Sequence, residues 1–312
     1  MKQVKIVIAG IGGVGGYFGG LLAKAFQDSA EVSVYFLARG KHLQAIRTHG
    51  LEVVSGEDTF IAQPGLATDD ASETGTADFV ILCTKGYDLE QMVQQLHPCI
   101  DKHTVILPLL NGADNRERVQ KLLPENTVYG GCAYIVSRLT GPGRIENTGN
   151  VQKLYFGLDG LENERLSLLE DLFKQAGVDA TLSANISDII WSKFIFISAI
   201  ATATSYFDLP VGALLEDAGR RETLITLIEE VIRVAKAKGI TTAADIHEKT
   251  LKQMESLPYA TTSSMHSDFQ VANHATEVES LTGYVVREGH ALGIAVPVFE
   301  KLYAALEKRS TR

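Results

Sequence analysis

The sequence predicts an α/β protein, in which an N-terminal Rossmann-type, doubly wound parallel sheet is followed by an all-helical C-terminal domain. Three observations predict this class. A β-branched run, Val4–Ile8, leads into a glycine-rich turn and then into helical spacing. Strand-like runs alternate with helical stretches in the first half of the chain, and only helical periodicity continues after Asn185. We therefore place the Rossmann domain at residues 1–183 and the helical domain at residues 184–312.

The first turn of the predicted sheet carries the pattern G-x-G-x-x-G at Gly10, Gly12 and Gly15. The first glycine permits a tight turn, the second leaves room for a pyrophosphate, and the third lets the helix pack against the strand. The helix N-terminus then presents unpaired N–H groups to the phosphates. A glycine-rich turn that binds nothing is the alternative, but the preceding strand and the following helix favour a dinucleotide. The candidate cofactor-binding residues of this loop are Gly10, Ile11, Gly12, Gly13, Val14 and Gly15.

The end of the second predicted strand indicates which dinucleotide is bound. A site for NAD usually has Asp or Glu there to hold the ribose 2′-hydroxyl, whereas this chain has Leu37, Ala38 and Arg39. A guanidinium group can hold a 2′-phosphate through a bidentate fork. Arg39 could instead be a solvated charge at a strand end, but the missing carboxylate favours NADPH as the cofactor.

Other strand ends bring further candidates to the same place. One buried strand is followed by Lys85, and the next ends before Asn111. Ligands bind at the carboxyl ends of parallel strands, so we expect Gly10, Arg39, Lys85 and Asn111 on one edge of the sheet. Asp88 is expected to cap the helix that follows Lys85. The other elements expected here are strands at Leu51–Val54, Thr59–Ala62, Asp78–Thr84, Thr104–Leu110 and Thr127–Val136, a hairpin at Gly141–Gly157 and a helix at Glu162–Gln175.

Length and composition limit the classes of function. A chain of 312 residues is expected to form two domains. The net charge of −9 argues against binding to nucleic acid or to an anionic membrane surface. Three widely spaced cysteines, without a C-x-x-C or a histidine cluster, predict reduced thiols in the cytoplasm and no metal site. We expect no targeting segment, and the most apolar run, Ile186–Ala203, is interrupted by charges and is not expected to span a membrane.

The helical domain begins with a strongly apolar helix that carries one lysine, Lys193. Such a lysine either extends its ammonium group to the surface or lies in a cleft for a purpose, and periodicity alone favours neither. A desolvated lysine has a lowered pKa and is a workable general acid. We expect the substrate in a cleft between the domains, beside the nicotinamide. Helices are expected at Ser187–Thr204, Leu214–Lys238, Thr242–Ser256, His266–Leu292 and Pro297–Arg309.

Two polar segments near the end of the chain have ordinary structural explanations. The hydroxyl-rich run around Ser264 is a helix-start signal, with Ser264 near the capping position. Glu277, judged by pattern alone, is a charge on a solvated helix face. Any functional role for Ser264 or Glu277 depends on which other motifs occur with them in the chain.

Together these residues resemble the ketopantoate reductase (2-dehydropantoate 2-reductase) family, over nearly the whole chain. The resemblance implies an NADPH-dependent oxidoreductase of pantothenate biosynthesis that reduces 2-dehydropantoate to (R)-pantoate. Eight motifs in one order are far more specific than any single one. They are Gly10–Gly15, Arg39-Gly40, Cys83-Thr84-Lys85, Leu110-Asn111-Gly112, Trp191-Ser192-Lys193, Thr262–Met265, Thr276-Glu277 and Gly293–Pro297.

The resemblance also implies roles for individual residues. Lys193 matches the family's general acid, and Glu277 matches the carboxylate that holds the substrate's carbonyl or hydroxyl group. Ser264 matches a substrate contact, and Asn111 lies where the family contacts both nicotinamide and substrate. Lys85, like the arginine after the second strand, matches a cofactor-binding position.

This chain differs from the family's usual pattern at three positions where the family binds its substrate. The family usually carries asparagines four and eight residues after the lysine, and another between a proline and a glycine. Here these positions are Ile197, Ala201 and Val211. On helical geometry, Thr204 is the one polar residue expected on the face of Lys193. Loss of buried amide partners changes substrate preference by orders of magnitude.

We therefore predict NADPH-dependent reduction of a small 2-keto acid, with ketopantoate as the first candidate. Two alternatives stay open, a reductase of a different small 2-keto acid and a non-catalytic NADPH-binding sensor. The joint presence of Lys193 and Glu277 counts against the sensor. The expected partner is a small-molecule substrate, and whether two chains form a homodimer is left open.

Overall fold

The chain divides into two compact units in the computed structural model, which describes residues 3–161, 163–271 and 275–310. The first unit contains Met1–Leu110 and Asp114–Ile186, and the second contains Asn111–Ala113 and Ser187–Arg312. The division after Ile186 lies close to the boundary expected after residue 183. The three residues Asn111–Ala113, expected in the first domain, group with the second unit.

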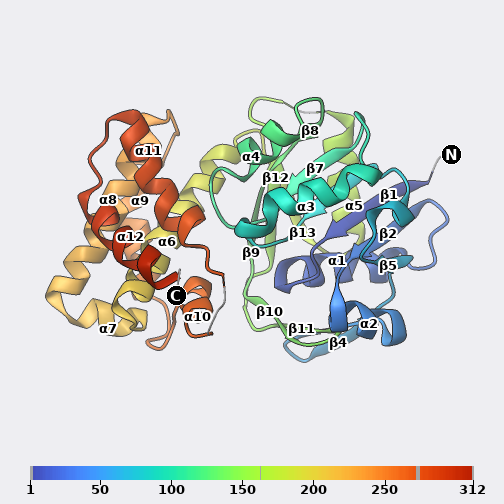
Figure 1. Cartoon of the computed structure of the whole chain (residues 1–312), viewed down its shortest axis with the longest axis horizontal. Coiled ribbons are helices and arrows are strands. Elements are labelled where there is room, and N and C mark those ends of the chain that lie inside the picture. Colours follow the sequence, from blue (N-terminus) through green and yellow to red (C-terminus); the bar gives the residue numbers. More distant parts are fainter. Residues whose placement is uncertain (1–2, 162, 272–274, 311–312) are drawn as a thin grey trace. The chain divides into compact units, whose positions relative to one another are not determined.

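A six-stranded sheet forms the centre of the first unit, with the order β5-β2-β1-β6-β7-β8 and every neighbouring pair parallel (Figure 1). The prediction of a Rossmann-type parallel sheet is thus confirmed. The strand order reverses between β1 and β6, which is where ligands bind in sheets of this kind. Ala9 pairs with both Leu37 and Leu82, so three strands end at the same level. The strands are β1 (Val4–Ala9), β2 (Val32–Leu37), β5 (Leu66–Thr68), β6 (Phe79–Leu82), β7 (Val105–Pro108) and β8 (Thr127–Val128).

Two smaller sheets complete the first unit, with the orders β10-β11-β3-β4 and β13-β12-β9. The single strand expected at Thr127–Val136 is instead divided between β8 and β9, because the buried Tyr129 and the glycine after it turn the chain from one sheet into another. The expected hairpin lies earlier, in β10 and β11, and β12 pairs with β9 and β13. Their bounds are β3 (Leu51–Ser55), β4 (Asp58–Ala62), β9 (Gly130–Tyr134), β10 (Ser137–Gly141), β11 (Arg144–Asn147), β12 (Lys153–Gly157) and β13 (Asp179–Leu182).

Helix α1 (Gly13–Phe26) packs against two sheets at once, and its glycines make this possible. A Cβ at Gly16 would lie 2.5 Å from Ile145 Cγ1 in β11, and one at Gly20 would lie 2.8 Å from Val53 Cγ2 in β3. The helix therefore touches the four-stranded sheet with bare backbone while its other face covers β1 and β2. The other helices of this unit are α2 (Gly40–His49), α3 (Leu89–Leu96), α4 (Asn115–Leu122), α5 (Glu164–Gln175) and the 3₁₀ turns η1 (Ala71–Thr74), η2 (Gly86–Asp88) and η3 (His97–Cys99).

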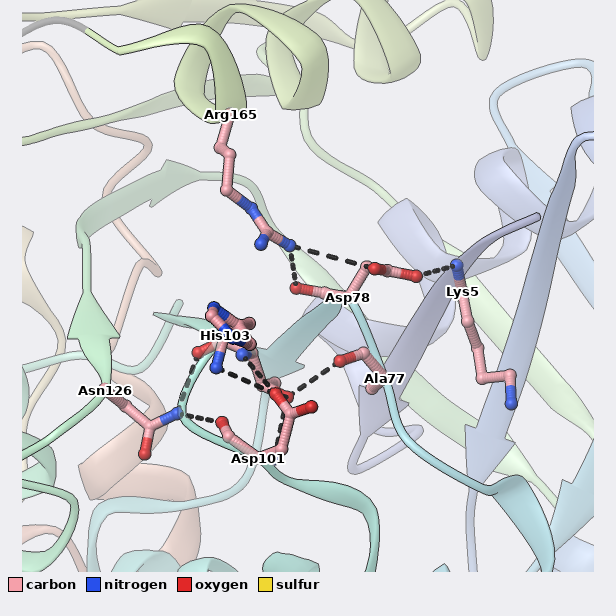
Figure 2. A network of polar contacts seen from close by, with 8 residues as sticks. Lys5, Ala77, Asp78, Asp101, His103, Asn126 and Arg165 are labelled. Atoms are coloured by element: carbon pink, nitrogen blue, oxygen red, sulfur yellow. Dashed lines mark hydrogen bonds and ion pairs between the residues drawn. The ribbon is translucent and has the colours of Figure 1, made fainter. Parts of the chain in front are cut away.

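Polar contacts fasten the loops at the amino ends of the parallel strands (Figure 2). The Lys5 backbone N–H donates to Asp78 Oδ2 at 3.0 Å, and Arg165 Nη2 donates to the Asp78 carbonyl at 2.9 Å. Thr104 Oγ1 donates to the Ala77 carbonyl at 2.7 Å. The Asp78 carboxylate and the Ala77 and Asp78 carbonyl groups at this edge are therefore satisfied by the chain itself.

The second unit is helical in every element the structure describes, which agrees with the predicted class. Two expected helices are divided. The helix expected at Leu214–Lys238 breaks at Asp217, whose side chain caps α8 by accepting from Arg220 N at 2.9 Å. The helix expected at His266–Leu292 is wrong as a single element; part of its middle, residues 272–274, lies outside the described residues. The helices are α6 (Ile186–Phe207), α7 (Val211–Glu216), α8 (Ala218–Ala237), α9 (Ile246–Glu255), α10 (Ser264–Phe269), the π-helical turn η4 (Glu279–Gly283), α11 (Tyr284–Leu292) and α12 (Pro297–Ser310).

Helix α6 is the central apolar element of this unit. Trp191 is 3% exposed and packs at 5.4 Å from Phe194 and 6.1 Å from Tyr284, ring centre to ring centre, as expected for a core residue. By length and composition α6 could cross a membrane, so its charges do not exclude a span, contrary to our expectation. However, 56% of its most apolar stretch is buried inside the structure, as in the core helix of a globular domain.

Candidate active site

The glycine-rich loop between β1 and α1 has the geometry of a phosphate-binding turn. Gly10 has a φ of +96°, which L side chains rarely adopt. A Cβ at Gly15 would lie 2.1 Å from the Gly10 carbonyl oxygen, so the helix packs directly onto the strand end. A Cβ at Gly12 would meet no described atom within 4 Å, and the first turn of α1 carries no acidic residue. The positive end of α1 is therefore open to a phosphate, as the loop pattern predicts.

Arg39 follows β2 at the same edge, but it is already engaged. Its Nη2 donates to Asp88 Oδ2 at 3.1 Å, and its side chain is 71% exposed. We expected Asp88 to cap α3; it occupies the N-cap position, yet its side chain makes no capping hydrogen bond. Its carboxylate turns to Arg39 instead. A guanidinium has five N–H donors, so this contact leaves Arg39 able to bind a phosphate beside a carboxylate.

The end of β6 lies beside the glycine-rich loop. The Cys83 N–H donates to the Ala9 carbonyl at 2.8 Å, which aligns the two strand ends. Lys85 is half-buried and precedes η2, so it lies at the edge where a cofactor contact was predicted. Burial raises the pKa of the Cys83 and Cys99 thiols, which keeps both protonated. The three cysteines, Cys83, Cys99 and Cys132, are all unpaired.

Two buried hydroxyl groups near the loop have no hydrogen-bond partner among the described residues. They are Thr84 Oγ1 and Ser137 Oγ. The sequence patterns assigned a role to neither of them. Thr84 stands inside a motif we quoted, but Ser137 reaches the loop only because the start of β10 packs against Gly13 of α1, a contact between distant parts of the chain for which no local pattern exists. Unsatisfied polar atoms beside an open phosphate-binding turn fit a dinucleotide, which would supply partners for them.

In the second unit, Lys193 and Asn111 meet directly. Lys193 Nζ donates to Asn111 Oδ1 at 3.0 Å, and both side chains are half-buried. The two sequence-predicted residues are thus brought together, and Lys193 does not extend freely to the surface. A neutral amide oxygen orients an ammonium group without cancelling its charge. This arrangement suits a group that must donate a proton to a developing alkoxide.

Glu277 is buried, not solvated. It is 3% exposed and directly precedes the start of α-helical and then π-helical structure, so the alternative explanation, a charge on a solvated helix face, does not hold. Thr282 of η4 exchanges a hydrogen bond of 2.8 Å with Thr202 of α6, which fixes the turn after Glu277. π-helical turns of this kind are frequent at functional sites.

Ser264 is exposed at the first position of α10, and Ser263 is the capping residue. Ser263 Oγ accepts from His266 N at 3.0 Å and lies 2.9 Å from Thr204 Oγ1. Thr204 Oγ1 itself donates to the Ile200 carbonyl at 2.7 Å, so Ser263 must be the donor to Thr204. Both hydroxyls are therefore used by the fold. Ser264 keeps its hydroxyl on the surface, where a ligand can reach it.

The three positions that depart from the family's asparagines differ in exposure. Ala201 is 2% exposed and Val211 is fully buried, so both belong to the core of the second unit. Ile197 is half-buried and packs against the same core from its edge. Of the three, Ile197 alone presents an appreciable apolar surface next to the turn of helix that carries Lys193.

A parallel sheet with a phosphate-binding turn at its switch point, followed by a helical unit with an oriented lysine, defines an oxidoreductase that uses a nicotinamide dinucleotide. Within the described ranges, no group of three or more His, Cys, Asp or Glu side chains is arranged to hold a metal ion.

Comparisons with known proteins give the family. The model "Ketopantoate reductase PanE/ApbA" matches residues 6–159, and its C-terminal counterpart matches residues 185–310. The "Uncharacterized oxidoreductase YkpB" of Bacillus subtilis is 33% identical, covering 97% of this chain and 98% of its own. The crystal structure of 2-dehydropantoate 2-reductase from Porphyromonas gingivalis W83 is 37% identical, with a TM-score of 0.86 over 98% of this chain and 99% of its own. This chain belongs to the ketopantoate reductase family.

A fourth comparison concerns the cofactor. The ternary structure of D-mandelate dehydrogenase with NADH and anilino(oxo)acetate is 25% identical, with a TM-score of 0.84 over 99% of both chains. The family therefore consists of NAD(P)H-dependent oxidoreductases that act on a CH–OH group, and their substrates are small keto acids.

Proposed function

We propose that this chain reduces 2-dehydropantoate to (R)-pantoate with NADPH, as a step of pantothenate biosynthesis. The observation that carries the proposal is the hydrogen bond from Lys193 Nζ to Asn111 Oδ1. It orients a proton donor in the unit that also holds the buried Glu277 and the exposed Ser264. The matching family model and the 2-dehydropantoate 2-reductase of similar structure support the choice of substrate.

The roles of the side chains follow from their chemistry. A bound nicotinamide would supply the hydride to the C2 carbonyl of the substrate. Lys193 donates the proton to the oxygen of that carbonyl, and Asn111 keeps the ammonium group in place. Glu277 orients the substrate by accepting a hydrogen bond, and Ser264 contributes a further polar contact. Orientation by fixed side chains of this kind supplies much of the rate enhancement.

We propose NADPH as the preferred cofactor because Arg39 stands where a 2′-phosphate is held and no carboxylate follows β2 directly. The glycine-rich loop, Lys85 and Asn111 complete the cofactor-binding set. The D-mandelate dehydrogenase of similar fold contains NADH, so we base the proposed preference on these side chains and not on the fold.

A second candidate, a reductase of a different small 2-keto acid, is favoured by a specific observation. Ile197, Ala201 and Val211 replace three amide side chains with apolar ones, and Thr204 is held by Ser263 and its own helix. A substrate with a plain hydrocarbon substituent would lose nothing here, whereas ketopantoate carries a hydroxyl group that needs a partner.

The first experiment measures NADPH oxidation with ketopantoate, beside NADH and beside a panel of 2-keto acids with unbranched, branched and aromatic substituents. The proposal requires the highest kcat/KM for ketopantoate with NADPH. A higher kcat/KM for a keto acid without a hydroxyl group on its side chain moves the assignment to the second candidate. We further propose that the enzyme acts in the cytoplasm, where its three unpaired cysteines stay reduced.

A further inference from the structure

We propose that the hydroxyl groups of Thr84 and Ser137 are ligands of the bound dinucleotide, donating hydrogen bonds to the pyrophosphate and its adjoining riboses from two sides of the glycine-rich loop. The proposal rests on the family's use of NAD(P)H. It does not depend on the choice between NADPH and NADH or on the identity of the keto acid.

Thr84 lies against the first glycine of the loop. It follows β6 at the switch point of the sheet, and its Cγ2 lies 3.1 Å from the position that a Cβ would take on Gly10. Its methyl group is thus pressed against the turn. Its Oγ1 is buried without a hydrogen-bond partner in the described chain. The residue therefore brings an unused donor to the point where the strand order reverses.

Ser137 lies against the other part of the loop. Its carbonyl oxygen lies 2.0 Å from the position that a Cβ would take on Gly13, the first residue of α1. The start of β10 is therefore packed onto the helix turn whose N–H groups face a phosphate. Ser137 Oγ is also buried without a partner among the residues described. Gly13 is needed because the serine backbone occupies the space of a side chain.

A buried hydroxyl without a partner destabilises a protein, so a fold normally provides one. This chain does so for Thr104, whose Oγ1 donates to the Ala77 carbonyl at 2.7 Å. Two unsatisfied hydroxyls on both sides of one ligand-binding turn are explained if the ligand satisfies them. Phosphate oxygens are charged acceptors, which form the stronger class of hydrogen bonds.

The test uses Thr84→Val and Ser137→Ala in the full chain. The readouts are the Kd of the reduced dinucleotide, measured from its fluorescence, and the Tm of the dinucleotide-free protein. Each variant should raise the Kd about tenfold, because a hydrogen bond to a charged group is lost. The Tm of the dinucleotide-free protein should stay the same or rise by about 1–3 °C, because an unsatisfied buried hydroxyl has been removed.

The matched control is Ser33→Ala. Ser33 Oγ is likewise buried without a described partner, but it lies on β2 opposite Lys5, at the far end of the sheet from the loop. This variant should leave the Kd unchanged. A Kd within twofold of the wild-type value in both test variants overturns the proposal. So does a lower Tm of the dinucleotide-free protein, because it would show that the chain or an internal water already satisfies these hydroxyls.

Discussion

Lys193 Nζ donates a hydrogen bond of 3.0 Å to Asn111 Oδ1, across 82 positions of the sequence. Lys193 comes from α6, whereas Asn111 follows β7 and groups with the helical unit although the sheet precedes it in the chain. Asn111, which follows the strand in the chain, thus places its amide oxygen against the ammonium group of Lys193. Because the amide is neutral, it fixes the direction of the ammonium group and leaves its positive charge intact for a developing alkoxide.

Replacing Lys193 by alanine should lower kcat by about 10²–10⁴-fold, which is the usual contribution of a positioned general acid. The Kd of the dinucleotide should change little, because Lys193 belongs to the helical unit and not to the glycine-rich loop. Steady-state kinetics and fluorescence titration measure the two quantities separately. Lys252→Ala, at an exposed lysine of α9, is the control and should retain full kcat. A near-normal kcat for Lys193→Ala would remove the lysine from the mechanism.

The Arg39–Asp88 pair should control the choice of dinucleotide. Arg39→Ala should weaken NADPH binding by about 10–100-fold and NADH binding much less, because only NADPH offers a 2′-phosphate to the guanidinium. Asp88→Asn removes a negative charge from a group 3.1 Å from Arg39 Nη2 and should tighten NADPH binding several-fold. Titration of both variants with both dinucleotides tests this. Equal effects on NADPH and NADH would show that Arg39 does not read the 2′ position.

Local patterns were sufficient for the cofactor-binding half of the fold. The β-branched strand, the three spaced glycines and the apolar helix lie within the first 26 residues, so local rules predicted their arrangement. The position of the predicted ligand site, at the edge where the parallel strands end, followed from parallel pairing alone. Asp88 occupies the predicted N-cap position of α3, but its carboxylate pairs with Arg39, 49 positions away, a contact that no local capping pattern predicts.

The substrate-binding half depended more on contacts between distant residues. The burial of Glu277 has no local signal, since the sequence around it reads as a polar helix start. The capping residue of α10 is Ser263, one residue before the expected Ser264. Its hydroxyl donates to Thr204 of α6, a contact between distant residues that a local capping pattern does not predict. Resemblance to the family, and not periodicity, was what separated Lys193 from an ordinary surface lysine.

His42 should make the stability of the protein depend on pH. Its Nδ1 accepts from Gly143 N at 2.8 Å, so the neutral ring is the form that fits. Burial lowers the pKa of His42 below 6.5, an effect that the nearby Ile11 backbone partly offsets. Below pH 6.5 the unfolded chain therefore binds a proton that the folded chain does not, and stability is lost as the pH falls.

The corresponding variant is His42→Asn, whose amide oxygen can still accept from Gly143 but does not titrate. Urea unfolding between pH 8 and about pH 5 should show a steeper loss of stability for the wild type than for the variant. Near pH 8 the imidazole is neutral in both the folded and the unfolded chain. The difference in the free energy of unfolding between the two proteins should therefore no longer change with pH there. Parallel curves down to the lowest pH would mean that His42 titrates alike in the folded and unfolded states.

The hydroxyl pair Thr202–Thr282 should hold the π-helical turn that follows Glu277. Both side chains are fully buried and 2.8 Å apart, so Thr282→Val leaves the Thr202 hydroxyl unsatisfied. We expect a loss of about 1–3 kcal/mol in the free energy of unfolding. The double variant with Thr202→Val should lose less than the sum of the single variants, because no buried hydroxyl then lacks its partner.

The kinetic consequence separates positioning from plain stability. If η4 positions Glu277, Thr282→Val should raise the KM for the keto acid and lower kcat at a temperature where the variant is still fully folded. Thr223→Val is the control, because the Thr223 hydroxyl donates to Gly219 within its own helix at 2.9 Å. It should leave both constants unchanged. A Thr282→Val enzyme that is less stable but kinetically normal would restrict this pair to a structural role.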